Sequence, residues 1–349
     1  MTTEILKIDP ENLSAAENEL SKAANVIKNG GLVIFPTETV YGLGADATSA
    51  DAALKIYKAK GRPSDNPLII HVAKPEDAEL YTETSALYYK LAKTFMPGPL
   101  TVIMPSKDII PLQTRASLPT VAIRCPENPI ARRLIELSGV PIAAPSANLS
   151  GSPSPTSFSH VKDDMLGRVD VIIDGGDADF GLESTIVKIE SDNTLTLLRP
   201  GKITPEQLSL IADVTIASAV VEKLGENEAP LSPGMKYRHY APKAPLALLD
   251  GDVNEICKYL EKYRRDRVAI LCYDEYEELI KTKLPEVTVY TFGKKEDKEE
   301  QAHRLFALLR SADKEDFDHI FAPLPETTGI GLALYNRMIR AAAHTIIKL

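Results

Sequence analysis

The sequence predicts an α/β protein of two domains, an α+β domain with a twisted mixed sheet followed by a doubly wound parallel sheet. At 349 residues the chain is longer than a single hydrophobic core normally serves. The segment EKLGENEAPLSPGMKYRHYAPKAP, at 222–245, is dense in proline, glycine and charge and is typical of an interdomain linker. Strands and helices alternate strictly only after this segment. We therefore expect domains at 1–215 and 245–349, joined by a linker at 216–244.

The first domain is expected to mix strands and helices without strict alternation. A helix at 14–29 begins at Ser14 as its capping residue, and a second helix, capped by Thr48, runs to about Ala59. Strands are expected at 32–35, 67–72, 100–104, 121–125, 169–174, 184–189 and 195–199, with further helices at 77–95, 129–137 and 204–212. Because strands outnumber helices and do not alternate with them, the pattern favours a mixed sheet.

The second domain has a regular pattern. Strands at 246–249, 268–273, 287–291 and 319–323 alternate with helices at 254–263, 276–284, 298–311 and 330–347. Such alternation is typical of a parallel sheet with helices on both faces, a Rossmann-like arrangement. No catalytic signature stands out in this domain.

The composition argues against several classes of protein. A net charge of −9 argues against a general affinity for nucleic acid or anionic membranes. Three cysteines, Cys125, Cys257 and Cys272, show neither metal-site spacing nor the even count of a disulfide framework, which fits a reduced compartment. The N-terminal residues lack a signal-peptide pattern, and no apolar run reaches membrane-spanning length. We therefore expect a cytoplasmic protein that does not enter membranes.

Two loops carry the most informative residues. Lys60 and Arg62 flank a glycine in KGRPSDNPL, and Ser146 and Asn148 lie in a second proline-flanked loop. Two cations in one turn suit a polyphosphate or a carboxylate better than a packed core. Complementing the dipole of the preceding helix, worth about 0.3–1 kcal/mol, explains one of these cations more readily than both. We therefore expect the two loops to orient one anionic ligand.

Two more arginines stand at strand ends. Arg124 ends an otherwise apolar strand, and Arg199 closes the strand at 195–199. Arg124 either pairs inside the protein or binds an anion, and we favour the anion. Arg199 offers another partner for an anion. Together with Lys60 and Arg62, they predict a polyphosphate cradle in a protein that is acidic overall.

Three other polar residues have two interpretations each. Thr37 follows a strand, where its hydroxyl suits a ligand-facing loop or local turn capping. His71 ends a strand, and a single histidine there is more often a hydrogen-bonded core residue than a base. Ser184 opens a strand, so its hydroxyl either reaches a ligand or simply starts the ladder.

Three further patterns are weak. Gly42-Leu-Gly-Ala-Asp-Ala47 matches the dinucleotide pattern G-x-G-x-x-A, but residues 36–41 separate it from the strand and the helix begins only at Ser49, so we do not expect nicotinamide binding. Gly201 and the lysine after it are not followed by a P-loop helix, so ATP would need another cradle. The acidic loop 174–181 could help hold magnesium, although solvated loops of this kind are commoner, and we assign no metal ligand.

Several segments, taken in order, resemble the YrdC-type threonylcarbamoyl-AMP synthase family. They are GGLVIFPTETVYGLG, KGRPSDNPLIIHV, MPGPLTVIM, VAIRCP, PIAAPSANLSGSPSPT and GLESTIV, within about residues 15–210. The segment SPGMKYRHYAP followed by an α/β domain is similar to the longer, two-domain branch of that family. The resemblance implies a YrdC-like first domain at 1–215.

The resemblance implies an enzyme that joins L-threonine, bicarbonate or CO2, and ATP into threonylcarbamoyl-adenylate and pyrophosphate. This is a nucleotidyltransferase reaction, with Mg²⁺ expected to accompany ATP. A separate tRNA threonylcarbamoyl transferase then uses the adenylate to modify tRNA, so that transferase and tRNA itself are the implied partners.

The resemblance also implies residue roles. Lys60 and Arg62 would be catalytic. The ATP side would consist of Lys60, Arg62, Ser64, Thr120, Ser146, Asn148, Ser154 and Arg199, and the threonine side of Thr37, His71, Arg124 and Ser184.

The linker is expected to act as a lid. An adenylate hydrolyses easily, and closing segments exclude water from labile intermediates. We therefore expect Ser232–Pro242 to fold over the active site, with His239 and Tyr240 touching the nucleotide.

The alternative function is an RNA-binding module that uses the cationic cleft without catalysis. The net charge and the scarcity of aromatic residues near the cations argue against it, because single-strand RNA recognition usually involves stacking. A steep salt dependence of tRNA affinity would favour RNA binding, whereas pyrophosphate release that needs threonine would favour the enzyme.

Overall fold

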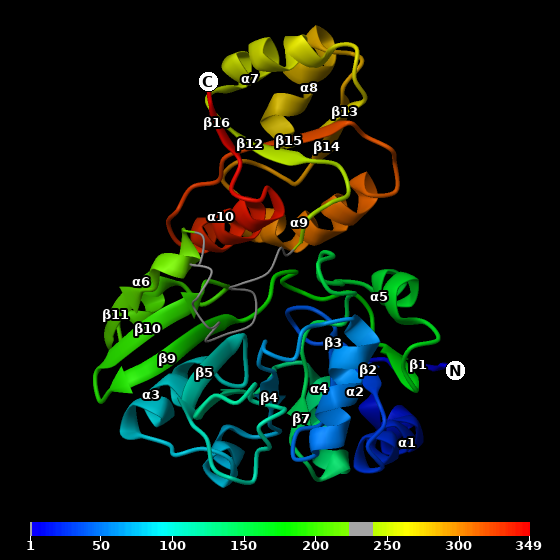
Figure 1. The fold of residues 1–349 in the computed structure, drawn as a ribbon, viewed down its shortest axis with the longest axis vertical. Coiled ribbons are helices and arrows are strands. Elements are labelled where there is room, and N and C mark those ends of the chain that lie inside the picture. Colours follow the sequence, from blue (N-terminus) through cyan, green and yellow to red (C-terminus); the bar gives the residue numbers. More distant parts are fainter. Residues whose placement is uncertain (1, 223–239) are drawn as a thin grey trace. The chain divides into compact units, whose positions relative to one another are not determined.

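The computed structural model describes residues 2–222 and 240–349 (Figure 1). It forms two compact units, of which the first comprises Met1–Ser150 and Ser154–Lys236 and the second Gly151–Pro153 and Tyr237–Leu349. Each unit has its own sheet and its own hydrophobic core.

The first unit is built on an eleven-stranded mixed sheet, which confirms the predicted fold class. The strands lie in the order β1-β8-β2-β3-β7-β4-β6-β5-β9-β10-β11, and both parallel and antiparallel pairs occur. They are β1 (Glu4–Lys7), β2 (Val33–Phe35), β3 (Gly42–Asp46), β4 (Ile69–His71), β5 (Leu100–Pro105), β6 (Thr120–Arg124), β7 (Ile142–Ala143), β8 (Val171–Asp174), β9 (Thr185–Ser191), β10 (Thr194–Arg199) and β11 (Asp213–Ile216).

Helices pack on this sheet through apolar stripes. They are α1 (Glu17–Lys28), α2 (Ala50–Lys60), α3 (Ala86–Phe95), α4 (Pro129–Ser138), α5 (Phe158–Met165) and α6 (Pro205–Leu208). Leu20 and Ile27 of α1 and Leu134 of α4 share one buried cluster with Val33 and Val171 of the sheet. The spacing of Leu20 and Ile27, seven residues apart, puts them on one face of α1.

The predicted start of the first helix is wrong. A 3₁₀ turn over Leu13–Ala16 comes first, and α1 begins at Glu17. Ser14 does not cap the helix, because its hydroxyl donates to Asn12 Oδ1 at 3.1 Å. A nearby side chain therefore competes successfully for the hydroxyl.

The predicted cap of the second helix is also wrong, by one residue. Ser49 caps α2, and its hydroxyl accepts from the Ala52 N–H at 3.2 Å. Thr48 instead donates to Asp46 Oδ1 at 2.7 Å. Two adjacent hydroxyls could cap this helix, and the turn made by Asp46 decides between them.

Two predicted helices of the first unit are shorter in the structure, and four strands were not predicted. The segment 77–95 contains a 3₁₀ turn over Pro75–Leu80 and then α3, and the segment 204–212 retains only α6.

The four strands that were not predicted have unusual sequences or positions. Strands β1 and β11 lie at the sheet edges with mostly exposed side chains, β7 has two residues, and β3 is rich in glycine. These features weaken the alternating pattern by which strands are recognised.

The second unit is a doubly wound parallel sheet, as predicted. Its strands lie in the order β14-β13-β15-β12-β16, and every pair is parallel. They are β12 (Leu246–Asp250), β13 (Val268–Cys272), β14 (Thr288–Thr291), β15 (His319–Pro323) and β16 (Ile346–Lys348), with helices α7 (Val253–Leu260), α8 (Asp274–Lys283), α9 (Lys298–Ala312) and α10 (Ile330–Ala341).

The last predicted helix, 330–347, is too long. Helix α10 ends at Ala341, and Ile346–Lys348 forms β16 beside β12. Ala343 and His344 have φ angles of 48° and 63°, in the left-handed region that interrupts a helix. Neither glycine nor proline marks this stop, so the sequence pattern did not reveal it.

The glycines of β3 permit close packing. Gly42 pairs with Phe35 across β2 and β3. A Cβ atom at Gly44 would lie 2.6 Å from Phe35 Cε1 and 2.7 Å from Ile142 Cγ2, whereas at Gly42 the nearest atom would be Phe35 Cζ at 3.3 Å. The close approach of Phe35 and Ile142 therefore explains why Gly44 needs to be glycine.

We expect Gly44→Ala to lower the free energy of unfolding by about 1–3 kcal/mol, the usual cost of overpacking. Gly42→Ala is the matched control on the same strand, and its loss should be clearly smaller. Urea denaturation of the two variants measures both values. Equal losses would contradict the packing explanation.

Candidate active site

One face of the central strands carries three of the candidate residues, Thr120, Arg124 and His71. Thr120 and Arg124 are four residues apart on β6, so their side chains point to the same face. His71 on β4 and Thr101 on β5 are the register partners of Arg124 on its two sides. Partners in neighbouring strands share a face, so His71, Arg124 and Thr101 form a polar row across three strands.

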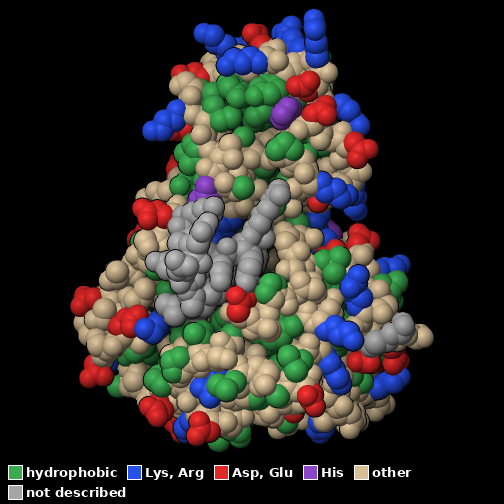
Figure 2. Space-filling view, viewed as in Figure 1, with side chains coloured by type: hydrophobic (Ala, Val, Ile, Leu, Met, Phe, Trp, Pro, Cys, Tyr) green, Lys and Arg blue, Asp and Glu red, His purple; other side chains and the backbone are tan. Residues whose placement is uncertain are grey.

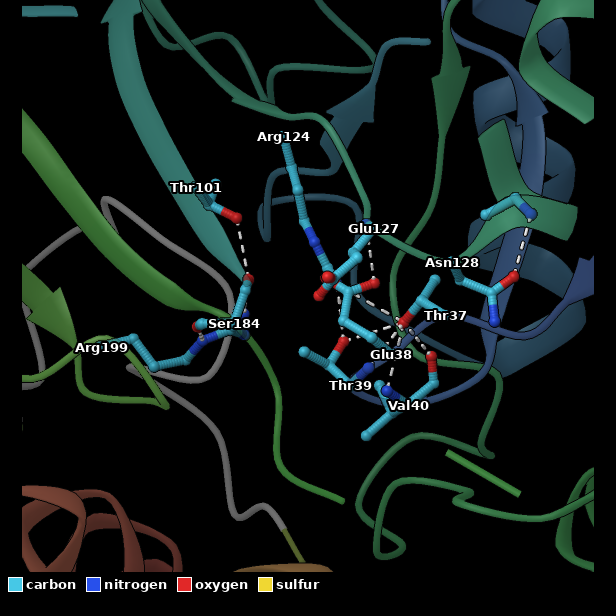
Figure 3. A network of polar contacts seen from close by, with 11 residues as sticks. Thr37, Glu38, Thr39, Val40, Thr101, Arg124, Glu127, Asn128, Ser184 and Arg199 are labelled. Carbon is cyan, nitrogen blue, oxygen red and sulfur yellow. Dashed lines mark hydrogen bonds and ion pairs between the residues drawn. The ribbon is translucent and has the colours of Figure 1, made fainter. Parts of the chain in front are cut away.

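Arg124 is the centre of a buried polar network (Figure 3). Its Nη2 donates to Glu38 Oε1 at 2.6 Å and to Thr39 Oγ1 at 2.9 Å, with a longer contact of 3.5 Å to Thr37 Oγ1. Glu38 Oε2 accepts from the Glu127 N–H at 3.2 Å. The Arg124 and Glu38 side chains are 5% and 7% exposed. The pair thus ties the loop after β2 to the end of β6.

The loop after β2 is a compact turn. Thr37 Oγ1 donates to the Val40 carbonyl at 2.7 Å and accepts from the N–H groups of Thr39 and Val40, each at 3.2 Å. Turn capping, one of the two interpretations of Thr37, is therefore present. The same hydroxyl also lies beside Arg124, which keeps the ligand-facing interpretation open.

Two buried polar atoms on this face have no hydrogen-bond partner in the described part of the chain. They are Arg124 Nε and His71 Nδ1. Burial, followed by the positive charge of Arg124, lowers the pKa of His71 from 6.5 to about 3, so its imidazole is neutral at pH 7. A carboxylate is a suitable partner for an arginine N–H in such surroundings.

Ser184 extends the polar row from the N-terminal end of β9. Its Oγ lies 2.8 Å from Thr101 Oγ1 (Figure 3). Arg199 donates through Nε to the Ser184 carbonyl at 3.0 Å and through Nη2 to Ser184 Oγ at 3.1 Å. The structure thus brings Arg199, expected on the nucleotide side, directly against Ser184, expected on the threonine side.

Lys60 joins the two loops that the sequence singled out. Helix α2 ends at Lys60, and Gly61 adopts the left-handed φ of 62° that terminates it. The Lys60 ammonium donates to the Ser146 carbonyl, to the Asn148 carbonyl at 2.6 Å and to Asn148 Oδ1 at 3.3 Å. Ser146 Oγ also donates to Asn148 Oδ1, at 2.5 Å. Lys60, which is 3% exposed, therefore holds the loop at 146–148 beside the end of α2.

The remaining candidates for the nucleotide side differ in how far they are buried. Arg62 Nη2 donates to the carbonyls of Asn66 and Pro67 at 3.3 and 3.2 Å. Ser64 is exposed, and Thr120 is half-buried at the start of β6. Ser154 is buried, and its hydroxyl donates to Glu183 Oε1.

An apolar patch lies on the same sheet face as the polar row. Ile69, Ile103 and Ala122 stand two residues from His71, Thr101 and Arg124 respectively, so they share that face. They form one buried cluster with Ile186, Leu198 and Ala219. The polar row therefore borders part of the hydrophobic core of the first unit.

The structure describes only the end of the expected lid. Residues 232–239, including His239, lie outside the described residues. Tyr240 is 5% exposed in the second unit, where its ring stacks on Phe306 with 5.0 Å between centroids. Arg337 lies 5.9 Å from the Tyr240 ring centroid. The expected contact between Tyr240 and the nucleotide stays a prediction.

Three residues of this network, Glu38, Thr39 and Thr101, received no role from the sequence. Glu38 and Thr39 directly follow Thr37, in the loop after the strand predicted at 32–35. An acidic residue between two threonines at the end of a buried strand was the available signal. For Thr101, only the strand register reveals the contact with Ser184.

Neither a metal centre nor a membrane helix occurs in the described parts of the chain. No group of three His, Cys, Asp or Glu side chains there could hold a metal ion, the acidic loop 174–181 included. No helix among the same residues has both the length and the apolar character needed to cross a bilayer.

The depressed pKa of His71 predicts how stability depends on pH. The unfolded chain protonates His71 below about pH 6.5, whereas the folded protein resists protonation until about pH 3. Stability should therefore fall as the pH drops through 6.5, with His71 contributing about 1 kcal/mol between pH 7.0 and 5.5. Urea unfolding at the two pH values, compared with His71→Gln, measures the difference. Identical pH dependence in the two proteins would contradict the prediction.

Comparisons with known proteins agree over the whole chain. A family model described as "Telomere recombination" matches residues 25–201, and one described as "Threonylcarbamoyl-AMP synthase, C-terminal domain" matches residues 203–343. Threonylcarbamoyl-AMP synthase of Bacillus subtilis is 43% identical over 97% of both chains, and that of Pyrococcus abyssi is 42% identical over 93% of this chain and 94% of the relative.

A solved structure extends the similarity to the fold. The crystal structure of P. abyssi Sua5 complexed with L-threonine is 39% identical and superposes with a TM-score of 0.88, covering 100% of both chains. Both the first unit with its site and the second unit are thus included in the match. The chain belongs to the threonylcarbamoyl-AMP synthase family, in its two-domain form.

Proposed function

We propose that this protein is an L-threonylcarbamoyladenylate synthase, which forms threonylcarbamoyl-AMP and pyrophosphate from L-threonine, bicarbonate or CO2, and ATP. The observation that carries the proposal is similarity over 97% of the chain to a synthase of this name. The product serves the threonylcarbamoyladenosine modification of tRNA. Catalysis is assigned to the domain at 1–215.

The polar row is proposed as the threonine end of the site. Arg124 offers a buried Nε–H without a partner in the described chain, which suits the threonine carboxylate. Two hydroxyl groups lie near Arg124. That of Thr37 contacts Arg124 itself, and that of Ser184 contacts Thr101, the register partner of Arg124. His71, neutral at pH 7, supplies a hydrogen-bonding ring nitrogen without adding charge.

The loops at the end of α2 are proposed as the nucleotide end. Lys60 and Arg62 are assigned to the phosphates, and Lys60 also fixes the loop of Ser146 and Asn148. The other residues assigned to the nucleotide are Ser64, Thr120, Ser154, Arg199, His239 and Tyr240. His239 and Tyr240 belong to the lid proposed at 216–244, which would shield the labile product from water.

The proposed chemistry proceeds in two steps without a covalent enzyme intermediate. The threonine amine first captures CO2 as a carbamate, and a carbamate oxygen then attacks the α-phosphate of ATP while pyrophosphate leaves. Negative charge builds up on the phosphates, so the Lys60 and Arg62 cations would stabilise the transition state. This step makes the enzyme a nucleotidyltransferase.

Magnesium is proposed to enter with ATP. Because the described residues provide no cluster of three acidic or histidine ligands, the triphosphate would supply most of the ion's ligands. When bound, the ion would neutralise phosphate charge. The downstream tRNA threonylcarbamoyl transferase is the partner that would consume the product, in the cytoplasm.

The reaction itself can be tested directly. We expect pyrophosphate release from ATP and magnesium only when both L-threonine and bicarbonate are present. A coupled pyrophosphate assay with each component omitted in turn checks this. Release that ignores threonine, or none at all, would contradict the proposal and leave RNA binding as the function to test. On the face in Figure 2, acidic and basic side chains are interspersed over the visible described part of the first unit.

Substitution of the two cations tests their assignment. We expect Lys60→Ala or Arg62→Ala to reduce adenylate formation by about 10²-fold or more, because each removes a fixed charge from the phosphates. Lys58→Ala, an exposed lysine on the same helix, should retain full activity. Circular dichroism confirms that each variant is folded. Near-normal activity in the Lys60 or Arg62 variant would disprove its assignment.

A further inference from the structure

We propose that Glu38 sets the charge selectivity of the amino-acid end of the site. By compensating Arg124, it allows this arginine to accept the carboxylate of a neutral amino acid while disfavouring polyanions such as pyrophosphate. The inference rests on the proposed function and adds Glu38 as a specificity-determining residue for the same reaction.

The Glu38–Arg124 pair is built into the fold. Its two side chains are almost fully buried, and Oε1 of Glu38 lies 2.6 Å from Nη2 of Arg124. The second carboxylate oxygen is held by the main-chain N–H of Glu127. Figure 3 shows the Arg124 side chain extending toward the turn that carries Glu38. A buried arginine requires a counter-charge, and here the loop after β2 provides it in a fixed position.

The pair leaves Arg124 able to bind a second carboxylate. All hydrogen bonds of Arg124 to described residues come from Nη2, whereas its buried Nε makes none of them. His71, the register partner of Arg124, is neutral at pH 7 and adds no positive charge. Arg124, Glu38 and His71 together therefore carry no net charge. A ligand that binds beside Arg124 would therefore find directed hydrogen-bond donors without a strong net positive potential.

The reaction makes this neutrality useful. Thr120 and Arg124, at the proposed nucleotide and threonine ends, are four residues apart on β6, or about 13 Å. Attraction to an uncompensated guanidinium grows with the charge of the ligand, so ATP phosphates and pyrophosphate would compete with threonine for it. A zwitterionic amino acid carries no net charge and depends more on directed hydrogen bonds. Glu38 would thus keep the threonine carboxylate at the Arg124 end of the site and the phosphates at the nucleotide end.

Calorimetric titration of L-threonine, without nucleotide, tests the proposal. Wild type, Glu38→Gln and Glu190→Gln are each titrated with and without methylenediphosphonate, a pyrophosphate mimic that resists hydrolysis. Glu190 forms an exposed ion pair with Lys188 on β9, so the control removes a paired carboxylate from the same sheet outside the site. Threonine binding is read out directly and does not depend on turnover.

We expect the diphosphonate to change the apparent Kd for threonine less than about twofold in the wild type and in Glu190→Gln. In Glu38→Gln it should raise that Kd roughly tenfold or more, in a competitive manner, because the guanidinium charge is no longer compensated. A folded Glu38→Gln protein that remains insensitive to diphosphonate would overturn the proposal. Weaker threonine binding without diphosphonate competition would also overturn it, since Glu38 would then only hold Arg124 in place.

Two further results keep the test decisive. If Glu38→Gln does not fold, Glu38→Asp retains the charge but withdraws it by one methylene, about 1.5 Å. Intermediate diphosphonate competition would then support the proposal, and wild-type selectivity would refute it. A wild-type protein that binds no threonine would instead refute the proposed function, which the pyrophosphate assay checks separately.

Discussion

The register that joins β4, β6 and β5 is the constraint on which the rest of the site depends. It places His71 and Thr101 on either side of Arg124, although the three residues come from separate parts of the chain. A shift of one residue in either pair would turn a polar side chain to the opposite face, where Ile70 and Ile123 are fully buried. Burial on that face therefore fixes the register, and the register in turn positions the polar row.

Two of the buried cations in the candidate site, Arg124 and Lys60, are held in different ways. Arg124 is compensated by a carboxylate, whereas the contacts of Lys60 with the loop at 146–148 go to carbonyl and amide oxygens. In both cases the cation also joins segments that lie far apart in the sequence. Charges fixed before a ligand arrives need little rearrangement during reaction, which is how electrostatic preorganisation favours catalysis. The side chains that are proposed to bind the substrates are thus also the ones that hold these segments together.

Much of the fold could be predicted from the sequence, because apolar periodicity and glycine stops are local signals. The end of α2 at Lys60 and the parallel sheet of the second unit were found in this way. Features without a clear local signature were missed, such as the choice of Ser49 over Thr48 as a cap and the left-handed turn at Ala343 that follows α10. Within the site, the cationic loops were recognisable, but Glu38 acquires its meaning only from Arg124, a partner distant in the sequence.

The separation of Thr120 and Arg124 along β6 has a consequence for inhibitor chemistry. Their side chains point to the same sheet face, and their backbones lie about 13 Å apart. With the residue roles proposed above, a bisubstrate compound would carry a carboxylate for Arg124 and a nucleotide-like group for the Thr120 end, joined by a spacer that spans this distance. Once one end is bound, the other is held at high effective concentration, so such a compound would gain affinity well beyond either fragment.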